Sequence, residues 1–335
     1  MFVTAKKAVE LLLQGNIVIL PTETVYGLAG LATKPSAIEK IYKVKKRPKE
    51  NPLICHVGDI RTIYEYSYVN AEEEKLLSFF PGPLTVLIRK RNIPDIVTAG
   101  SEFCAFRMPT HKIFLEIANK VTVPIAAPSA NPSGRISPTS EEIAYEYFGE
   151  TIDIVKGGKC EIGIESTVVR VIKKNTLEIL RAGFFTKEFF VNQGFTIVES
   201  KKENDFLSPG LLPKHYSPSI PLILFSQNYM EYLKNENYKE KLITILENVY
   251  EPIKKQNLRC KKIGFLIYGE EFKKNSIFYN LSKSSNLQEI AKNLFLYLKE
   301  MEKNFDVIFA FKPPIKEGLG VAIIDRLRRA SEFEI

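Results

Sequence analysis

Residues 17–28 read IVILPTETVYGL, and this stretch gives the first indication of the fold. Four consecutive apolar residues predict a buried strand at 17–20, which Pro21 ends. Two threonines, a carboxylate and a tyrosine follow at the carboxyl end of that strand, where open α/β sheets bind ligands. An ordinary capped turn has a similar composition, so the pattern alone leaves both readings open.

The rest of the chain alternates helices with short strands. The predicted strands of the first two hundred residues lie at 17–20, 53–57, 84–90, 104–109 and 123–130. Capping boxes predict three helix starts, formed by Ser36 with Glu39, Asn70 with Glu73, and Thr139 with Glu142. Two further strands, 166–172 and 176–181, are expected to pair as a hairpin through the turn at 174–175.

A chain of 335 residues is long enough for two domains. The stretch LSPGLLPKHYSP, residues 207–218, contains three prolines and a glycine and disfavours both helix and strand. Strands at 221–225, 261–269 and 305–311 alternate with helices after it, which predicts a compact three-layer α/β unit. We therefore predict a large domain at 1–200, a linker at 201–219 and a smaller α/β domain at 220–335.

Composition excludes several classes of protein. Four cysteines lie far apart without a CxxC pair, which argues against a disulfide framework and structural zinc and favours a cytoplasmic location. No run of eighteen apolar residues occurs, so we expect no membrane association. The net charge of +8 suits anionic ligands or transient RNA contact, although a lysine-rich solvated surface gives the same balance.

Two more stretches carry polar side chains between prolines. KKRPKENPLICH, residues 45–56, ends a predicted helix with a basic cluster that could clamp a polyphosphate, and a solvated helix end is the alternative. APSANPSGRISPTS, residues 127–140, offers hydroxyl and amide groups that could bind phosphate or carboxylate oxygens, and a plain surface loop is the alternative. No GxxxxGK[ST], GxSxG or HExxH motif occurs, and GLG at 318–320 is a weak dinucleotide signal. The pattern therefore predicts an anion-binding α/β enzyme that uses Lys and Arg side chains.

Seven motifs in order resemble the YrdC-like family: PTETVYGL (21–28), KKRPKENPLICH (45–56), PGPLT (81–85), FRMPTH (106–111), PSANPSG (128–134), STVV (166–169) and LRAG (180–183). SPGLLPKHYSP (208–218) and the α/β unit after it are similar to the long two-domain form, the L-threonylcarbamoyladenylate synthases. The resemblance implies a twisted, partly open mixed sheet as the catalytic domain and a smaller Rossmann-like α/β domain.

The implied reaction joins L-threonine, bicarbonate and ATP into threonylcarbamoyl-AMP with release of pyrophosphate. The product feeds the threonylcarbamoyl modification of the adenosine beside the tRNA anticodon. The implied partners are these substrates and the downstream tRNA threonylcarbamoyl transferase machinery, and weak RNA contact is also expected. Mg²⁺ is expected to enter with ATP, with no resident metal site and no further organic cofactor.

The resemblance also assigns the residues of the site. The implied ATP ligands are Lys45, Arg47, Asn51, Cys104, Ser129, Asn131, Ser137, Arg181, His215 and Tyr216. The implied threonine ligands are Thr24, His56, Arg107, Ala127, Ser166 and Thr167. Catalysis is assigned to Lys45, Arg47, Arg107 and Ser129, with Arg107 pairing with the substrate carboxylate.

Two other functions fit part of the pattern. A non-catalytic RNA-binding module would use the same basic charge, but it would not need a small pocket built from Arg107, His56 and Thr24. A carbamoyl transferase of hydrogenase maturation would carry CxxC pairs, which are absent here. Because a labile intermediate must be shielded from water, we expect residues 208–218 to fold over the pocket as a lid, with His215 and Tyr216 touching ATP; a passive linker is the alternative.

Overall fold

The computed structural model describes residues 1–198, 215–249, 257–270, 276–313 and 317–335. The chain forms two compact units, Met1–Pro213 and Lys214–Ile335. Most of the predicted lid, residues 208–214, lies outside the described residues. Within the described parts of the chain, no helix is both long and apolar enough to span a bilayer.

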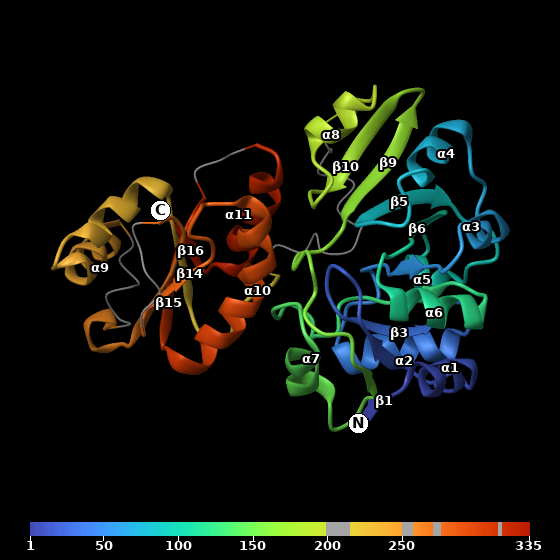
Figure 1. Ribbon diagram of the computed structural model, residues 1–335, viewed down its shortest axis with the longest axis horizontal. Helices are drawn as coiled ribbons and strands as arrows, with labels where there is room; N and C mark the ends of the chain where they lie inside the picture. Colours follow the sequence, from blue (N-terminus) through green and yellow to red (C-terminus); the bar gives the residue numbers. More distant parts are fainter. Residues whose placement is uncertain (199–214, 250–256, 271–275, 314–316) are drawn as a thin grey trace. The chain divides into compact units, whose positions relative to one another are not determined.

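Among the described residues of the first unit, eleven strands form one sheet in the order β1-β8-β2-β3-β7-β4-β6-β5-β9-β10-β11 (Figure 1). The strands are β1 (Phe2–Val3), β2 (Val18–Leu20), β3 (Gly27–Leu31), β4 (Ile54–His56), β5 (Leu84–Arg89), β6 (Phe103–Arg107), β7 (Ile125–Ala126), β8 (Ile154–Val155), β9 (Thr167–Lys173), β10 (Thr176–Arg181) and β11 (Thr196–Val198). Parallel pairs such as β4 with β6 alternate with antiparallel pairs such as β5 with β6. The predicted mixed α/β sheet is therefore confirmed.

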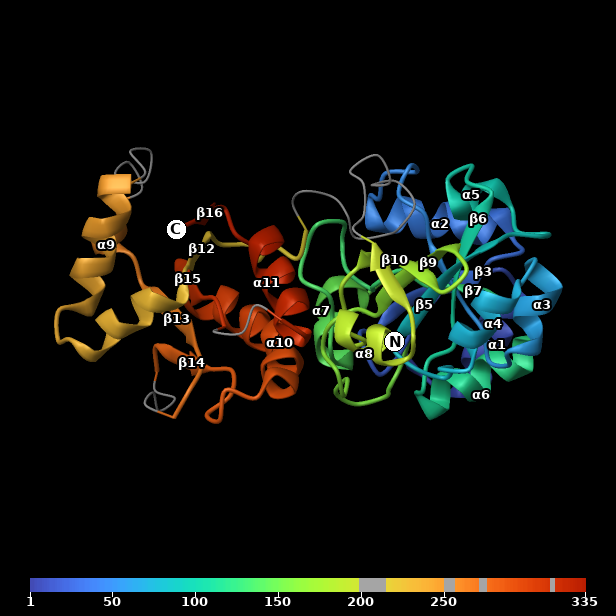
Figure 2. The same cartoon turned by 90° about the horizontal axis from the view of Figure 1, so that it is seen from above.

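Helices cover both faces of this sheet: α1 (Ala5–Leu13), α2 (Pro35–Lys45), α3 (Arg61–Tyr66), α4 (Ala71–Leu77), α5 (Asp95–Thr98), α6 (Lys112–Val121), α7 (Glu141–Phe148) and α8 (Lys187–Asn192). Successive side chains of a strand point to opposite faces. On β2, Val18 and Leu20 pack with α1 and α6, whereas Ile19 packs with α2. Helix α2 lies on one side of the strands and α1 and α6 lie on the other (Figure 2). The buried strand expected from IVIL thus lies between two helical layers.

The observed helix N-termini can be compared with the predicted capping boxes. The box of Asn70 with Glu73 is confirmed, because the Asn70 side chain accepts from Glu73 N while the Glu73 carboxylate accepts from Asn70 N. The box of Ser36 with Glu39 is wrong: α2 begins at Pro35, whose fixed φ and missing N–H suit the first turn without a side-chain cap.

The predicted cap of α7 by Thr139 with Glu142 is also wrong. The helix itself covers the expected residues 141–148, but its cap is Ser140, whose side chain accepts from Ile143 N. The carbonyl of Thr139 instead accepts from Cys160 N at 2.8 Å, which ties the end of the serine-rich loop to the segment after β8.

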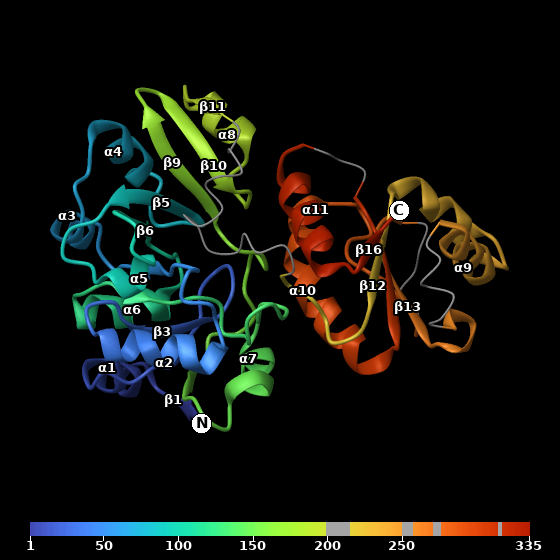
Figure 3. The same cartoon turned by 180° about the vertical axis from the view of Figure 1, so that it is seen from behind.

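The predicted hairpin is confirmed as the antiparallel pair β9–β10, with α8 and β11 beside it (Figure 3). Its turn contains Asn175 at φ 52°, a left-handed conformation that asparagine tolerates.

The second unit contains a parallel sheet in the order β14-β13-β15-β12-β16 among its described residues. Its strands are β12 (Leu222–Phe225), β13 (Ile263–Ile267), β14 (Phe278–Asn280), β15 (Val307–Phe311) and β16 (Phe333–Glu334), and its helices are η2 (Gln227–Lys234), α9 (Tyr238–Val249), η4 (Leu258–Cys260), α10 (Leu287–Asn304) and α11 (Leu319–Ala330). Helices α10 and α11 lie side by side against one face, and α9 lies on the other side of the strands (Figures 1 and 2). The three-layer α/β architecture predicted for this part of the chain is confirmed.

Candidate active site

The loop from β2 to β3 contains Thr24, which is fully buried. The hydroxyl of Thr22 lies 2.7 Å from the carbonyl of Val25 and 2.9 Å from the hydroxyl of Thr24. Because Thr22 gives its only hydroxyl proton to Val25, Thr24 is the donor in the second bond. The lone pairs of the Thr24 oxygen therefore stay available to accept a hydrogen bond from a ligand.

Arg107 ends β6 and forms a buried ion pair with Glu23 from the same loop. Arg107 Nη2 lies 2.7 Å from Glu23 Oε1, and the two side chains are only 4% and 3% exposed. Glu23 was not among the predicted site residues, although its carboxylate belongs to the PTET motif. The structure therefore places an acid beside the arginine that was expected to meet the substrate carboxylate.

His56 lies directly beside Arg107, because β4 and β6 pair in parallel with these two residues in register. Burial, followed by the charge of Arg107, lowers the pKa of His56 to about 3. The imidazole is therefore neutral at physiological pH, and its Nδ1 lies 3.2 Å from the carbonyl of Ile54. His56 shapes the wall of the pocket without adding a positive charge.

Lys45 is the last residue of α2, and Lys46 turns the chain at φ 50°. The Lys45 side chain is 1% exposed, and its Nζ donates to the carbonyls of Ser129, at 2.5 Å, and Asn131. No carboxylate pairs with it among the described residues. Burial, together with the nearby Arg47, lowers the pKa of Lys45 well below its usual range. An anion bound here would restore the charged form, because it would supply the missing counter-charge.

Arg47 folds back over the turn that follows α2. Its Nε donates to Asn51 O at 3.0 Å, and its Nη2 donates to Asn51 Oδ1 at 2.5 Å and to Pro52 O at 2.8 Å. These bonds hold the proline-bracketed segment 48–52 and fix the position of the guanidinium. Arg47 and Asn51, predicted together from KKRPKENP, are brought together.

The loop 127–140 is held along the loop that begins at β2. Ala130 N donates to Tyr26 O, and Tyr26 N donates to Pro138 O, both at 2.8 Å. Ser129 and Asn131 lie beside Lys45 through the carbonyl bonds described above. The Ser137 hydroxyl donates to Glu165 Oε1 at 2.6 Å. Ala127, predicted to contact threonine, is buried in the core formed with α1 and α6.

The motif STVV meets LRAG across the β9–β10 hairpin. Arg181 donates from Nε to Ser166 O and from Nη2 to Ser166 Oγ, both at 3.1 Å. The hydroxyl of Thr167 donates to Phe185 O at 2.8 Å, so its proton is already used within the fold. Gly183 permits this close approach, since a Cβ there would lie 2.4 Å from Thr167 N.

Several buried polar atoms of these loops have no hydrogen-bond partner within the described residues. They are Glu23 Oε2, Asn51 Nδ2, Arg107 Nε, His111 Nδ1, Asn131 Oδ1 and Thr139 Oγ1. Unsatisfied buried polar groups are rare in folded proteins and each needs an explanation. All six belong to the PTET, KKRPKENP, FRMPTH and serine-rich segments, so a polar ligand bound between these segments is the simplest explanation.

Three predicted ATP ligands do not belong to these loops. The thiol of Cys104 is buried in the core, and burial and neighbouring Cys55 raise its pKa well above the usual range, so only the backbone of Cys104 is available to a ligand. His215 and Tyr216 belong to the second compact unit. The Tyr216 ring stacks on Phe295 of α10 at 5.3 Å. Their contact with ATP therefore stays a prediction.

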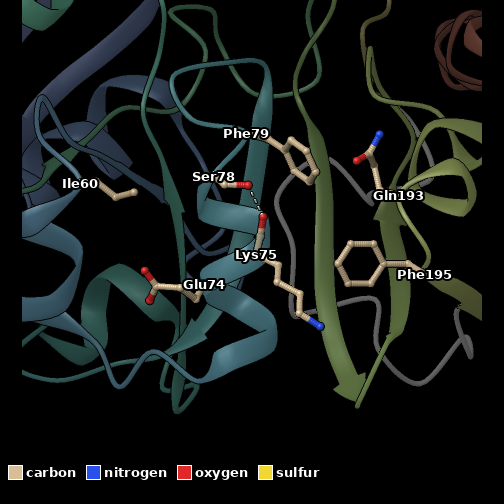
Figure 4. A pocket seen from close by; sticks show the side chains of 7 residues that line it. All are labelled: Ile60, Glu74, Lys75, Ser78, Phe79, Gln193 and Phe195. Atoms are coloured by element: carbon tan, nitrogen blue, oxygen red, sulfur yellow. Dashed lines mark hydrogen bonds between the residues drawn. The ribbon is translucent and has the colours of Figure 1, made fainter.

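A hollow on the surface of the first unit is a separate feature. It has a volume of about 550 Å³ and lies beside α4 and the segment leading into β11 (Figure 4). Its lining consists of Ile60, Glu74, Lys75, Ser78, Phe79, Gln193 and Phe195. None of the predicted site residues lines this hollow, and its walls lack the buried cations of the loops described above.

The described residues contain no cluster of three or more His, Cys, Asp or Glu side chains suited to a metal ion. They do contain four buried basic side chains in the polar loops, Lys45, Arg47, Arg107 and Arg181, against the buried carboxylates Glu23 and Glu165. This excess of positive charge suits an anionic ligand held by side chains.

Two family models match the chain. The Sua5_yciO_yrdC model, described as "Telomere recombination", matches residues 10–183, and the Sua5_C model, described as the threonylcarbamoyl-AMP synthase C-terminal domain, matches residues 172–332. A threonylcarbamoyl-AMP synthase of Pyrococcus abyssi is 33% identical over 331 residues, covering 96% of this chain and 92% of that protein. One of Bacillus subtilis is 33% identical over 341 residues, covering 97% and 92%. The crystal structure of P. abyssi Sua5 complexed with L-threonine has a TM-score of 0.81 and 31% identity, covering 99% of this chain and 96% of that one.

Proposed function

Since the chain belongs to the Sua5_yciO_yrdC family, in its long form with the Sua5 C-terminal domain, we propose that it makes threonylcarbamoyl-AMP from L-threonine, bicarbonate and ATP. Pyrophosphate is the second product, and the first product serves tRNA threonylcarbamoyladenosine modification by a downstream transferase. The observation that carries the proposal is the buried amino group of Lys45, which has no carboxylate partner among the described residues, together with the buried, half-satisfied Arg107 in the same set of polar loops.

Threonine binds in the pocket of Thr24, His56 and Arg107. The guanidinium of Arg107 receives the substrate carboxylate through its unpaired Nε. Neutral His56 and the Thr24 oxygen complete the polar wall, and Ser166 lies across the sheet with Arg181. The hydroxyl groups of Thr24 and Ser166 favour an amino acid that carries its own hydroxyl.

ATP binds with its phosphates against Lys45, Arg47 and Arg181, and Mg²⁺ enters as part of the ATP substrate complex. The carbamate oxygen of N-carboxythreonine attacks the α-phosphorus, and pyrophosphate leaves. This step needs alignment and charge neutralisation more than a protein nucleophile. Lys45 supplies a charge that is stabilised mainly when the anion is present, because burial otherwise disfavours it.

The other expectations extend this proposal. The prediction that residues 208–218 act as a lid over the nucleotide belongs to this proposal, although residues 208–214 lie outside the described part of the chain. A cytoplasmic location is supported by four free cysteines, of which Cys55 and Cys104 are buried neighbours without a disulfide. A role restricted to RNA binding is disfavoured, because a buried arginine–carboxylate pair offers nothing to an RNA backbone.

The test is a pyrophosphate-release assay with the full-length protein. We expect pyrophosphate only when threonine, bicarbonate and ATP are all present, with threonylcarbamoyl-AMP as the co-product. ATP turnover at the same rate without threonine would show that the chain is a different kind of ATP-using enzyme.

A further inference from the structure

The ion pair of Glu23 with Arg107 is only half satisfied. One contact joins them, from Arg107 Nη2 to Glu23 Oε1 at 2.7 Å. The second carboxylate oxygen and the guanidinium Nε have no partner within the described residues, although both side chains are buried. A buried ion pair is stabilising only when its remaining hydrogen-bonding positions are also filled. The pair therefore presents one vacant acceptor and one vacant donor to a ligand.

An α-amino acid in its zwitterionic form supplies the complement of these two positions. Its carboxylate can accept from Arg107 Nε without breaking the existing Nη2 bond, and its ammonium can donate to Glu23 Oε2. Thr24, next to Glu23 in the chain, adds an acceptor oxygen. A ligand that carries both charges on groups attached to one carbon therefore complements this pair.

The reaction also requires a proton acceptor at this position, because an ammonium group has no lone pair with which to attack carbon. Arg107 on β6 pairs with Glu23, and Cys160 after β8 lies close enough to Glu23 to interact with its charge. One step further out, His56 on β4 neighbours Arg107 and Glu141 on α7 neighbours Cys160. Neutral His56 is a weak base, since its pKa is lowered to about 3. Burial raises the pKa of Cys160, so its thiol keeps its proton, and Glu141 is engaged with the hydroxyl of Tyr26 at 2.8 Å. The Glu23 carboxylate is therefore the group at this position that can accept the proton.

We propose that Glu23 binds the ammonium of L-threonine through Oε2 and accepts its proton as the nitrogen attacks. This inference rests on the proposed function. The N–H electron pair stays on nitrogen as the proton moves to the Glu23 carboxylate. The freed lone pair then forms the N–C bond to the carbon of bicarbonate, whose hydroxyl leaves as water with one of the two remaining amine protons. The products are the carbamate of threonine, water and protonated Glu23, and charge is conserved.

Glu23→Gln and Glu23→Asp in the full-length protein test this assignment. The matched control is Glu178→Gln, because Glu178 on β10 is also a buried carboxylate, paired with Arg170 at 2.6 Å, but lies outside the polar loops of the site. Pyrophosphate release is measured against threonine concentration and pH, and threonine and ATP binding are measured by calorimetry.

For Glu23→Gln we expect kcat at neutral pH to fall by about 100-fold, a typical effect of losing a general base. The threonine Kd should rise about tenfold, whereas ATP binding should stay within about threefold of the wild type. The residual rate should rise about tenfold per pH unit up to the pKa of the threonine amine, because only free amine then reacts. Glu23→Asp should recover part of the rate, and Glu178→Gln should keep the wild-type pH profile and threonine Kd.

A merely structural role predicts a different result. Glu23→Gln would then lose rate in parallel at every pH, with the pH profile of the wild type, and that result would overturn the proposal, as would an unchanged threonine Kd. If Glu23→Gln fails to fold, Glu23→Asp is the test, because its shorter side chain keeps the charge but moves the acceptor oxygen; a kcat and a threonine Kd equal to those of the wild type would then overturn the proposal. If the wild-type protein shows no threonine-dependent pyrophosphate release, the proposed function is wrong. Calorimetry of the variants with threonine would still test the contact between Glu23 and the ammonium group.

Discussion

Replacing Lys45 with methionine should weaken ATP binding strongly while leaving the fold intact. The Lys45 ammonium carries three donors, and the carbonyls of Ser129 and Asn131 take two of them. The third donor and the charge are available to a phosphate oxygen. Losing one hydrogen bond to a charged group costs about 1.5–3 kcal/mol, which corresponds to a roughly 10- to 150-fold increase in the ATP Kd.

The same substitution should change how stability depends on pH. Burial lowers the pKa of Lys45 in the folded protein, so the unfolded chain binds this proton more tightly. The free energy of unfolding therefore rises as pH increases from the folded pKa to that of unfolded lysine, about 10.4. Lys45→Met lacks this titration, and its stability should rise less over that range.

Calorimetric titration with ATP and urea unfolding at several alkaline pH values measure both effects. Lys43→Met is the matched control, since Lys43 lies two residues earlier on α2 with an exposed side chain. It removes the same charge and should leave the ATP Kd within about threefold and the pH dependence unchanged. If Lys45→Met binds ATP within threefold of the wild type, the assignment of Lys45 to the phosphates is wrong.

Three further substitutions test separate parts of the structure. The pKa of His56 is lowered to about 3, so the free energy of unfolding of the wild type should fall as pH drops from about 6.5 toward 3. In urea unfolding, His56→Asn should show a smaller decrease over this range; an equal decrease in both proteins would contradict the burial of His56 in its neutral form. Gly183→Ala places a Cβ 2.4 Å from Thr167 N, so we expect about 1–3 kcal/mol of destabilisation in thermal unfolding and a raised threonine KM, and wild-type values for both would show that the segment can shift freely. Tyr216→Ala removes a fully buried ring stacked on Phe295, so the second unit should lose about 3–5 kcal/mol in urea unfolding; a loss of ATP affinity with unchanged stability would favour the lid contact instead.

Local signals predicted much of the fold. The capping box of Asn70 with Glu73 and the β9–β10 hairpin each depend on residues within a few positions of one another. The start of α2 and the cap of α7 differ from the prediction, because Pro35 begins α2 without a side-chain cap and Ser140 caps α7 in place of Thr139. The strands β1 and β8 contain two residues each and form only by pairing across about 150 residues, so no local pattern marks them.

In the site, too, contacts between residues close in the sequence were predictable and contacts between distant residues were not. Arg47 and Asn51, four positions apart, were predicted together and are in contact. The pairing of Glu23 with Arg107 joins residues 84 positions apart, and it depends on the order of strands in the sheet. The sequence motifs therefore predict that the loops of Glu23 and Arg107 belong to the site. Only the fold shows that Arg107 already has an acidic partner.

Incomplete hydrogen bonding locates this site better than the shape of the surface does. The hollow near Phe79 and Phe195 is wide, but its polar groups Lys75 and Glu74 already have partners in Glu72 and Tyr64. In the polar loops, by contrast, the described residues leave six buried polar atoms without partners, and leaving such an atom unsatisfied costs about 1–3 kcal/mol. When a polar ligand binds and supplies the missing hydrogen bonds, this unfavourable free energy is removed. The same atoms should therefore make the ligand-free protein measurably less stable than the complex, with the difference set by ligand concentration relative to Kd.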